Sequence, residues 1–199
     1  MLVLPEDVRI FNVQRGVVVR AKLVDLTRKL AAREIDGTWW KIPVSKQVRD
    51  GEGDHHWEWR KLLGENRNDL AIEALAVQSS SGAIEGATLH RIDAKSQLEP
   101  GEGAIYVDRL AAAPRNRPWL VESPNYKGIG TALLLACVRH SYSLGLGGRV
   151  WLTSLPSEQT RGFYHKRGFE MIFQEQGGTI DFELPADKAQ QWLKREGYL

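Results

Sequence analysis

The stretch NYKGIGTALL, residues 125–134, places Gly128 and Gly130 immediately before an apolar run. The run predicts a helix that begins at the glycines and extends to about residue 144. The first amide groups of a helix lack backbone partners and carry partial positive charge, so they can bind an anion. Glycine keeps side chains away from a phosphate, and Lys127 adds a positive charge. We interpret the stretch as a pyrophosphate-binding loop; alternatively, the glycines only turn the chain.

Two common nucleotide-binding motifs do not fit this loop. In the ATP-binding motif G-x-x-x-x-G-K-S/T the lysine follows the glycines, whereas Lys127 precedes them. The dinucleotide motif requires a third glycine where this chain has Leu133, with an acidic residue further on at a spacing that is missing here. Neither nucleotide class is therefore favoured.

The composition is that of a globular protein with one core. Of 199 residues, 42% are hydrophobic and 26% charged, so we expect a single domain over residues 1–199. No apolar run approaches the ~20 residues of a membrane span, and the start MLVLPEDVRIF is too acidic for a signal peptide. The formal charge of +2 is dispersed, unlike a nucleic-acid-binding surface. We expect a cytoplasmic protein that binds neither membrane nor nucleic acid, with its one cysteine, Cys137, in the core.

Alternating and β-branched segments predict strands in both halves of the chain. In the first half we expect a hairpin in 35–44 around Asp36-Gly37, a loop at 46–54, and a helix at 55–64 capped by Asp54. Segment 115–127 is interpreted as irregular. Helices and strands alternate in the second half, which predicts an α/β or α+β fold with a sheet of mixed direction. The expected strands are 16–26, 70–78, 83–93, 104–114, 149–155, 169–175 and 179–184, and the last two helices are 157–168 and 186–197.

Two motifs in the second half resemble the GNAT family of N-acetyltransferases. Residues 125–130 fit the acyl-CoA loop pattern Q/R-x-x-G-x-G/A, except that Asn125 stands for Gln or Arg. The stretch TSLPSEQTRGFYHKRGFEMI, residues 153–172, resembles the second signature, N-x-x-A-x-x-F/L-Y-x-x-x-G-F, with Ser157 and Thr160 in place of Asn and Ala. The resemblance is clear over about 105–172. It implies a mixed, mostly antiparallel sheet of about seven strands with helices on both faces.

The resemblance also implies acetyl-CoA as co-substrate. The family's fourth and fifth strands separate, and the pantetheine arm lies between them; small alanines would suit that approach, although they would equally suit a tightly packed sheet. The implied CoA-binding residues are Leu110, Ala111, Ala112, Ala113, Asn125, Tyr126, Lys127, Gly128, Ile129, Gly130, Thr131 and Ser157.

Catalytic roles follow from the same resemblance. Tyr164 matches the general acid that protonates the CoA thiolate; taken alone, it would be a packed aromatic residue. An alkyl amine is mostly protonated at pH 7, so a base is required. Alternation puts Asp108 on one face of the strand with Leu110 and Ala112, where family members carry acid/base residues. Asp108 is the preferred base, and its alternative is an ion pair with Arg109 or Arg91.

The segment after Pro114 is roughly eight residues longer than the family pattern. Because such insertions often line acceptor sites, Asn116, Arg117 and Trp119 could select the substrate; a solvated loop is the alternative. The five histidines share no ligand spacing, so we predict no metal. We expect His140 to be a core or capping residue and His165 to be exposed. The early tryptophans are interpreted as core or interface and could form a homodimer surface.

The sequence thus predicts an N-acetyltransferase that transfers an acetyl group from acetyl-CoA directly to a primary amine. The amine could belong to a small molecule or a peptide. Two other classes stay open. A non-catalytic acyl-CoA-binding sensor or scaffold would need neither Asp108 nor Tyr164, and a nucleotide-dependent phosphotransferase would need a magnesium ligand near Thr131.

Overall fold

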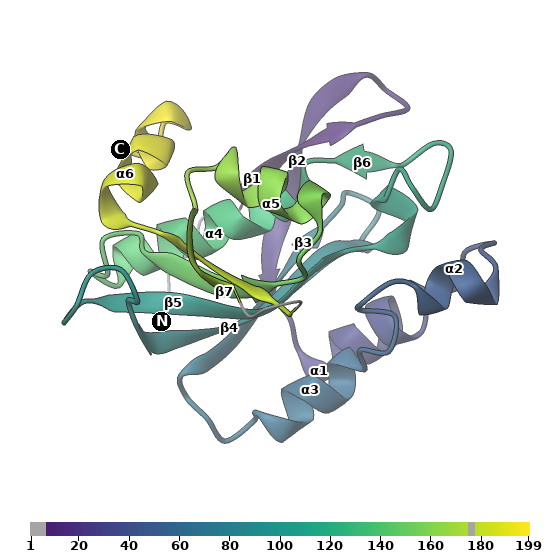
Figure 1. The fold of residues 1–199 in the computed structure, drawn as a ribbon. Helices are drawn as coiled ribbons and strands as arrows, with labels where there is room; N and C mark the ends of the chain where they lie inside the picture. The colour runs from purple at the N-terminus through teal and green to yellow at the C-terminus, as the bar shows by residue number, and fades with distance from the viewer. Residues whose placement is uncertain (1–6, 175–177) are drawn as a thin grey trace. The chain divides into compact units, whose positions relative to one another are not determined.

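The computed structural model describes residues 7–174 and 178–199 (Figure 1). The chain divides into two compact units. The first unit contains the chain up to Leu89 together with Arg109–Leu133, and the second contains His90–Asp108 and Leu134–Leu199. Strands β4 (Ile84–Lys95) and β5 (Gly103–Ala112) and helix α4 (Ile129–Ser143) contribute residues to both units. The expectation of a single domain stays a prediction.

Strands of the first unit follow the order β6-β1-β2-β3-β4-β5. Strands β1 (Asp7–Asn12) and β2 (Val17–Asp25) form an antiparallel pair, and β3 (Ile72–Gln78) pairs with β2. The two-residue strand β6 (Tyr126–Lys127) pairs with β1, where Phe11 lies opposite Lys127. Neither β1 nor β6 was expected from sequence. The loop that precedes the glycines is therefore anchored to a strand from the start of the chain.

Short helices pack against this part of the sheet. They are α1 (Arg28–Ala31), the π-helix η1 (Ala32–Asp36), α2 (Lys46–Asp50) and α3 (Trp59–Glu65), with α1 and α3 side by side (Figure 1). Trp39 and Trp59 are buried with ring centroids 6.2 Å apart, and Trp39 Nε1 donates to the carbonyl oxygen of Ile84 at 3.0 Å. The prediction that early tryptophans fill the core is confirmed for these two residues.

Three expectations for the first half are wrong. Residues 35–44 form no hairpin, because Ile35 and Asp36 end the π-helix η1 and residues 37–45 contain no strand. Helix α2 lies within the predicted loop 46–54. Asp54 does not cap the next helix. Asp36 does, because its two carboxylate oxygens accept the amides of Trp59 and Arg60 at 2.9 and 3.0 Å. The Asp-Gly pair that suggested a hairpin turn instead serves a contact more than 20 residues away, and no local pattern encodes such a contact.

In the second unit the strand order is β4-β5-β7-β9-β8. Strand β7 (Val150–Ser154) is parallel to β5 and antiparallel to β9 (Ile180–Leu184), which pairs with β8 (Glu170–Gln174). Helices α5 (Glu158–His165) and α6 (Ala186–Arg195) complete the unit with the rest of α4. The mixed, mostly antiparallel α/β fold is confirmed. The described residues form nine strands rather than seven, because β1 and β6 are added to the predicted set.

A fully buried carboxylate organises one loop of the second unit. Glu183 on β9 accepts hydrogen bonds from the Ser96 hydroxyl and from the amides of Gln97 and Leu98. Cys137 and His140 are buried in α4 and His165 is exposed, as predicted. The turn of the predicted last hairpin includes residues 175–177, which lie outside the described residues. None of the helices in the described ranges combines the length and apolar character needed to cross a membrane.

Candidate active site

The start of α4 has the geometry expected of an anion-binding site. Gly128 has φ +86°, a conformation that disfavours side chains, and a Cβ added there would meet nothing within 4 Å. The first helical hydrogen bond runs from the Ala132 amide to the Gly128 carbonyl at 2.9 Å. The amides of Ile129 and Gly130 therefore precede the first such bond, as at any helix N-terminus. An exposed glycine beside these amides fits a diphosphate, so the chain's own geometry suits acyl-CoA.

The residues before Gly128 are held by main-chain contacts. The amide of Val13 donates to the Asn125 carbonyl at 3.0 Å, and Tyr126 and Lys127 form β6. Lys127 is exposed. The loop is thus fixed on its β1 side and leaves the lysine charge at the surface, next to the glycine.

Strand β5 extends beyond its pairing with β7. The parallel ladder runs from Ile105 opposite Val150 to Val107 opposite Leu152, whereas β5 continues to Ala112. In the family the pantetheine arm lies where these two strands separate. The end of the ladder is therefore the feature of β5 that the resemblance leads us to expect.

The predicted side chains on β5 divide between its two faces. Asp108, Leu110 and Ala112 are half-buried, whereas Ala111 and Ala113 are buried in the core with Trp39 and Trp59. Core packing accounts for Ala111 and Ala113, so any contact of these two residues with a ligand would use their main chain. The amide of Ala113 is already engaged, because it donates to the Glu85 carbonyl at 2.8 Å.

Asp108 lies one residue after the last rung of the β5–β7 ladder. Of the two arginines considered as alternative partners, Arg91 forms an ion pair with Asp93 at 3.0 Å, and the Arg109 guanidinium lies 5.1 Å from the centroid of the Trp57 ring. The role of Asp108 as base stays a prediction.

Tyr164 is buried in α5 among aromatic rings. Phe163, Phe169 and Phe182 lie with ring centroids 5.2 to 5.4 Å from the Tyr164 ring. Burial raises the pKa of Tyr164 to about 12, against an opposing effect of the Arg167 charge. The hydroxyl is therefore protonated throughout the neutral pH range and can act as a donor. The same burial agrees with the alternative reading of Tyr164 as a packed aromatic.

Ser157 begins α5. Its hydroxyl accepts the amide of Thr160 at 3.1 Å, and the two hydroxyl oxygens are 2.5 Å apart. The two positions that depart from the family signature thus form a helix cap with each other. A contact of Ser157 with CoA stays a prediction.

The inserted segment is built into the first unit around Arg117. Its guanidinium is buried and donates twice to the Ala112 carbonyl, from Nε at 3.0 Å and from Nη2 at 2.7 Å. Nη1 donates to Glu52 at 2.6 Å and to Asp54 at 2.8 Å, and the Trp40 ring centroid is 5.4 Å from the guanidinium carbon. Burial lowers the pKa of Arg117, but hydrogen bonds and charges from Asp54 and Glu52 outweigh it and raise the pKa. The cation is permanent.

Asn116 is buried beside Arg117 and links two other elements. Its Nδ2 donates to the Glu85 carboxylate at 2.8 Å, and its Oδ1 accepts the Tyr126 amide at 3.0 Å. Arg115 Nε donates to the same carboxylate at 3.0 Å, and the Arg115 carbonyl accepts the Asn125 amide at 3.3 Å. The segment is not a solvated loop at these positions. A direct substrate contact by Asn116 or Arg117 stays a prediction.

Trp119 differs from Asn116 and Arg117 because the residue is 55% exposed. Its Nε1 donates to the Glu52 carboxylate at 2.8 Å, which leaves the ring surface open to solvent. Among the three inserted residues, Trp119 is therefore the one whose side chain could reach a ligand without breaking a buried network.

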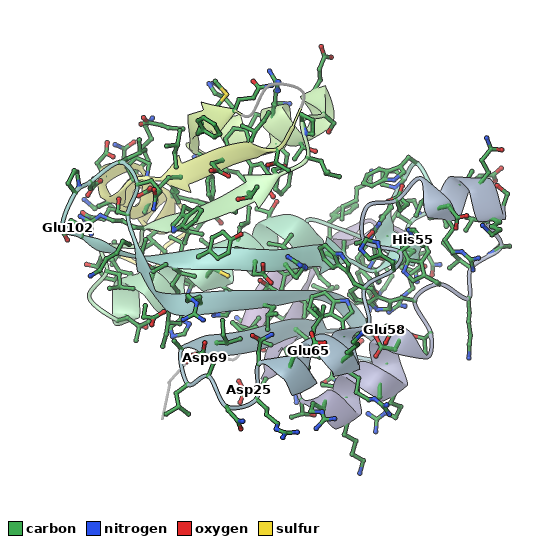
Figure 2. All side chains as sticks on the ribbon, turned by 60° about the horizontal axis from the view of Figure 1, so that its bottom comes forward. Asp25, His55, Glu58, Glu65, Asp69 and Glu102 are labelled. Atoms are coloured by element: carbon green, nitrogen blue, oxygen red, sulfur yellow. The ribbon has the colours of Figure 1, made fainter. Side chains whose placement is uncertain are left out.

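Sequence reasoning missed three acidic residues, Glu52, Asp54 and Glu85. Two of them lie in the loop between α2 and α3 that also carries His55 (Figure 2). Each is separated from its partner in the inserted segment by 30 residues or more. One signal was present, namely three arginine or asparagine residues in succession at 115–117, but it does not identify the partners.

Two histidines come together in the second unit. His90 on β4 and His140 on α4 are fully buried, with ring centroids 5.6 Å apart. The sequence did not predict this pair, because the two histidines share no metal-ligand spacing. Because imidazole is a common ligand of transition metals, the expected absence of a metal remains a prediction.

The chain belongs to the acetyltransferase (GNAT) family, whose model matches residues 53–169. The match contains the end of β5, the inserted segment, the glycine loop and Tyr164. It confirms the resemblance drawn from the two motifs. No curated protein sequence matches the chain.

Solved structures similar to this chain share its fold at low identity. Apo FdhC, described as a nucleotide-linked sugar GNAT, has a TM-score of 0.61 and 11% identity over 96% of this chain and 97% of its own. A chimera of the spermidine N-acetyltransferase SpeG from Vibrio cholerae and hSSAT has a TM-score of 0.56 and 15% identity over 85% and 98%. An AtaT toxin mutant bound to an antitoxin C-terminus and acetyl-CoA has a TM-score of 0.55 and 16% identity over 86% and 96%.

Proposed function

We propose that the protein is an N-acetyltransferase that transfers an acetyl group from acetyl-CoA directly to a primary amine. The observation that carries the proposal is the start of α4, where Gly128 exposes a helix N-terminus beside Lys127. Membership of the GNAT family gives this site its most economical ligand, the diphosphate of CoA. The proposed CoA contacts are Leu110–Ala113 through their main chain, residues 125–131, and Ser157.

The chain's own groups would then divide the reaction between them. Acetyl-CoA supplies an acyl group already activated as a thioester. Asp108, directly or through a water, takes a proton from the amine, whose nitrogen forms the new bond to the acyl carbon as the carbon–sulfur bond breaks. A backbone amide near the end of β5 stabilises the negative charge on the carbonyl oxygen. Since the Ala113 amide donates to Glu85, Ala112 is the better candidate.

Tyr164 would face the departing sulfur. A phenol with a pKa of about 12 is a weaker acid than a thiol with a pKa of about 8.5, so in this environment full proton transfer to the thiolate is uphill. Hydrogen-bond donation to the sulfur is the role that the burial of Tyr164 supports. Full transfer would require the pKa to fall when the site is occupied.

The acceptor is an amine of a small molecule or a peptide. The similar structures include a spermidine N-acetyltransferase chimera and a nucleotide-linked sugar GNAT. At identities of 11 to 15%, the acceptor of one protein cannot be assigned to another. The panel for a test should therefore include a polyamine, an amino-sugar nucleotide and a lysine-containing peptide.

Calorimetric titration with acetyl-CoA and with ATP tests the cofactor part of the proposal. We expect saturable binding of acetyl-CoA and none of ATP, because the glycine loop has the acyl-CoA spacing. Incubation with acetyl-CoA and the amine panel, followed by mass spectrometry, should then reveal a product 42 Da heavier than one amine. Absence of acetyl-CoA binding would overturn the proposal.

A second experiment distinguishes catalysis from CoA binding without catalysis. The double variant Asp108→Asn, Tyr164→Phe should still bind CoA but lose most of the acetylation rate. If the wild-type chain binds CoA and acetylates nothing, or if the double variant acetylates as fast as wild type, the sensor or scaffold function is favoured instead.

A further inference from the structure

One peptide group at the end of β5 is fixed from both sides. The carbonyl of Ala112 accepts two hydrogen bonds from Arg117, and the amide of the same peptide, that of Ala113, donates to the Glu85 carbonyl. A carbonyl oxygen has two lone pairs, so Arg117 uses its full capacity. This peptide cannot rotate without breaking three hydrogen bonds, and it is joined through the Cα of Ala112 to the preceding peptide, which carries the Ala112 amide.

The guanidinium that holds this peptide is itself immobilised. Glu52 and Asp54 accept its remaining donors, and the Trp40 ring lies against it. The two carboxylates outnumber the single positive charge, so this group does not supply a net positive field to the site. Its contribution is therefore geometric.

Asn116, the residue before Arg117, contacts the main chain that leads into the proposed diphosphate loop of the same unit. Asn116 joins the Glu85 carboxylate on β4 to the Tyr126 amide, two residues before Gly128. Glu85 also receives Arg115 and, through its carbonyl, the Ala113 amide. Residues 115–117 thus contact the end of β5 and the entrance of the glycine loop through one connected set of hydrogen bonds.

We infer that the inserted segment is a positioning device for the acyl-CoA site. Arg117 orients the Ala112 amide toward the thioester carbonyl, and Asn116 sets the main chain that leads into the diphosphate loop. This inference rests on the proposed function. It assigns the two residues a role different from substrate contact, because their donors and acceptors are used within the protein.

Lysine cannot replace arginine in this role. The planar guanidinium makes five hydrogen bonds at once, two to one carbonyl and three to the carboxylates of Glu52 and Asp54, whereas a lysine ammonium has three donors around one atom. Arg117→Lys keeps the positive charge that Glu52 and Asp54 require, so the variant isolates geometry from charge. Asn116→Ala removes the acceptor of the Tyr126 amide and therefore tests the contact with the diphosphate loop separately.

The experiment combines calorimetry with amide NMR of protein labelled with ¹⁵N-alanine. Each variant is titrated first with CoA, which has no acyl carbonyl, and then with acetyl-CoA. The matched control is Arg60→Lys, an exposed arginine on α3 of the same unit. Thermal melts confirm that each variant is folded; Arg117→Gln is a second variant of the same site.

Two separate effects are expected. In wild type and in Arg60→Lys, the Ala112 amide signal moves with acetyl-CoA beyond its position with CoA. In Arg117→Lys this acetyl-specific shift is lost, whereas the dissociation constant of CoA changes less than threefold. In Asn116→Ala the acetyl-specific shift is kept at saturation, whereas the CoA dissociation constant rises about tenfold, or ~1.4 kcal/mol.

A loss of overall structure would weaken both readouts together in both variants, and that outcome would contradict positioning. The inference is also wrong if folded Arg117→Lys keeps the acetyl-specific shift, or if the Ala112 amide of wild type does not respond to acetyl-CoA although CoA binds. No CoA binding to wild type would instead overturn the proposed function itself.

Discussion

At the scale of single residues, the structure separates side chains whose surroundings fix one role from those that a ligand could still reach. Arg117 and Asn116 are buried and bonded within the protein, so their chemical capacity is used. Gly128, Lys127 and Trp119 are exposed. A ligand can approach these three residues without breaking an internal contact.

Tyr164→Phe removes one hydroxyl and leaves the aromatic packing in place. If the hydroxyl donates to the leaving sulfur, kcat should fall about 10- to 100-fold, at or below the lower limit of the usual ~10²–10⁴-fold range, because a thiolate is a fair leaving group. KM for acetyl-CoA and the melting temperature should change little. Steady-state kinetics with an accepted amine measure the effect; an unchanged kcat would assign Tyr164 to the core alone.

Because burial raises the pKa of Tyr164 to about 12, its ionisation should not limit activity in the ordinary working range. We expect no loss of kcat between pH 8 and pH 10 that disappears in Tyr164→Phe. A pH–rate profile of both proteins checks this. A loss near pH 9 that is present only in wild type would show that the pKa is far lower in the working enzyme.

Gly128→Ala tests the diphosphate site. Alanine at φ +86° is strained by about 1 kcal/mol, and its methyl group would stand where a phosphate should approach. Gly82→Ala is the matched control, because Gly82 has φ +87° and equally open surroundings in the turn after β3. Both variants should lose similar stability, but only Gly128→Ala should weaken CoA binding, by tenfold or more in calorimetry. Equal CoA affinities would contradict the assignment.

At the scale of elements, helix α3 depends on a residue outside its own sequence neighbourhood. Glu58 occupies the N-cap position but makes no capping bond with its side chain, whereas Asp36 accepts the amides of Trp59 and Arg60 (Figure 2 shows Glu58 and Glu65 near the ends of α3). The carboxylate thereby joins η1 to α3.

Asp36→Ala should therefore lower the free energy of unfolding by about 1 to 2 kcal/mol, the usual cost of losing an N-cap. Glu58→Ala is the control and should cost less than about 0.5 kcal/mol, as exposed substitutions usually do. Urea denaturation measures both. The reverse order of the two effects would place the cap at Glu58.

At the scale of the whole molecule, buried histidines should limit stability in acid. Burial, aided by the charge of His140, lowers the pKa of His90 to about 3, and burial also lowers the pKa of His140. Below about pH 6.5 the unfolded chain binds protons that the folded chain does not, so the free energy of unfolding falls as pH decreases toward 3. For His90 alone the loss is about 2 kcal/mol at pH 5.

Chemical denaturation at pH 7 and pH 5 measures this slope. His90→Asn should flatten it, whereas His165→Asn should not, because His165 is exposed. A slope that is equal in wild type and His90→Asn would mean that other groups cause the acid instability.

Much of the second half of the chain followed from local patterns. The helix at the glycines, the strand 149–155 and the short helix around Tyr164 were all expected and are present as α4, β7 and α5. Their signals are local: an apolar period, a positive-φ glycine and a capping serine act within a few residues. Strand β1 was missed because its alternation is short, and β6 because two residues carry no period.

The candidate site was predictable to the same extent. The glycine loop and Tyr164 come from motifs with fixed spacing, and Asp108 was placed on its strand by alternation and by the family resemblance. Partners of Arg117 and Asn116 could not be inferred, because hydrogen bonds between residues 30 to 65 apart depend on where the chain returns. The sequence offered two uses for the inserted segment, substrate contact and solvated loop. The structure shows a buried network at Asn116 and Arg117, which is not a solvated loop, and substrate contact stays a prediction.

The sequence by itself determined the features that depend on local motifs. These are the acetyltransferase family, the helix N-terminus at Gly128, and the candidate donor Tyr164 and base Asp108. What only the tertiary structure decided is which groups are already used. A buried guanidinium must find carboxylates and carbonyls to offset its desolvation, and those groups come from the α2–α3 loop and the end of β5. Long-range compensation of this kind has no period in sequence, so only the fold reveals it.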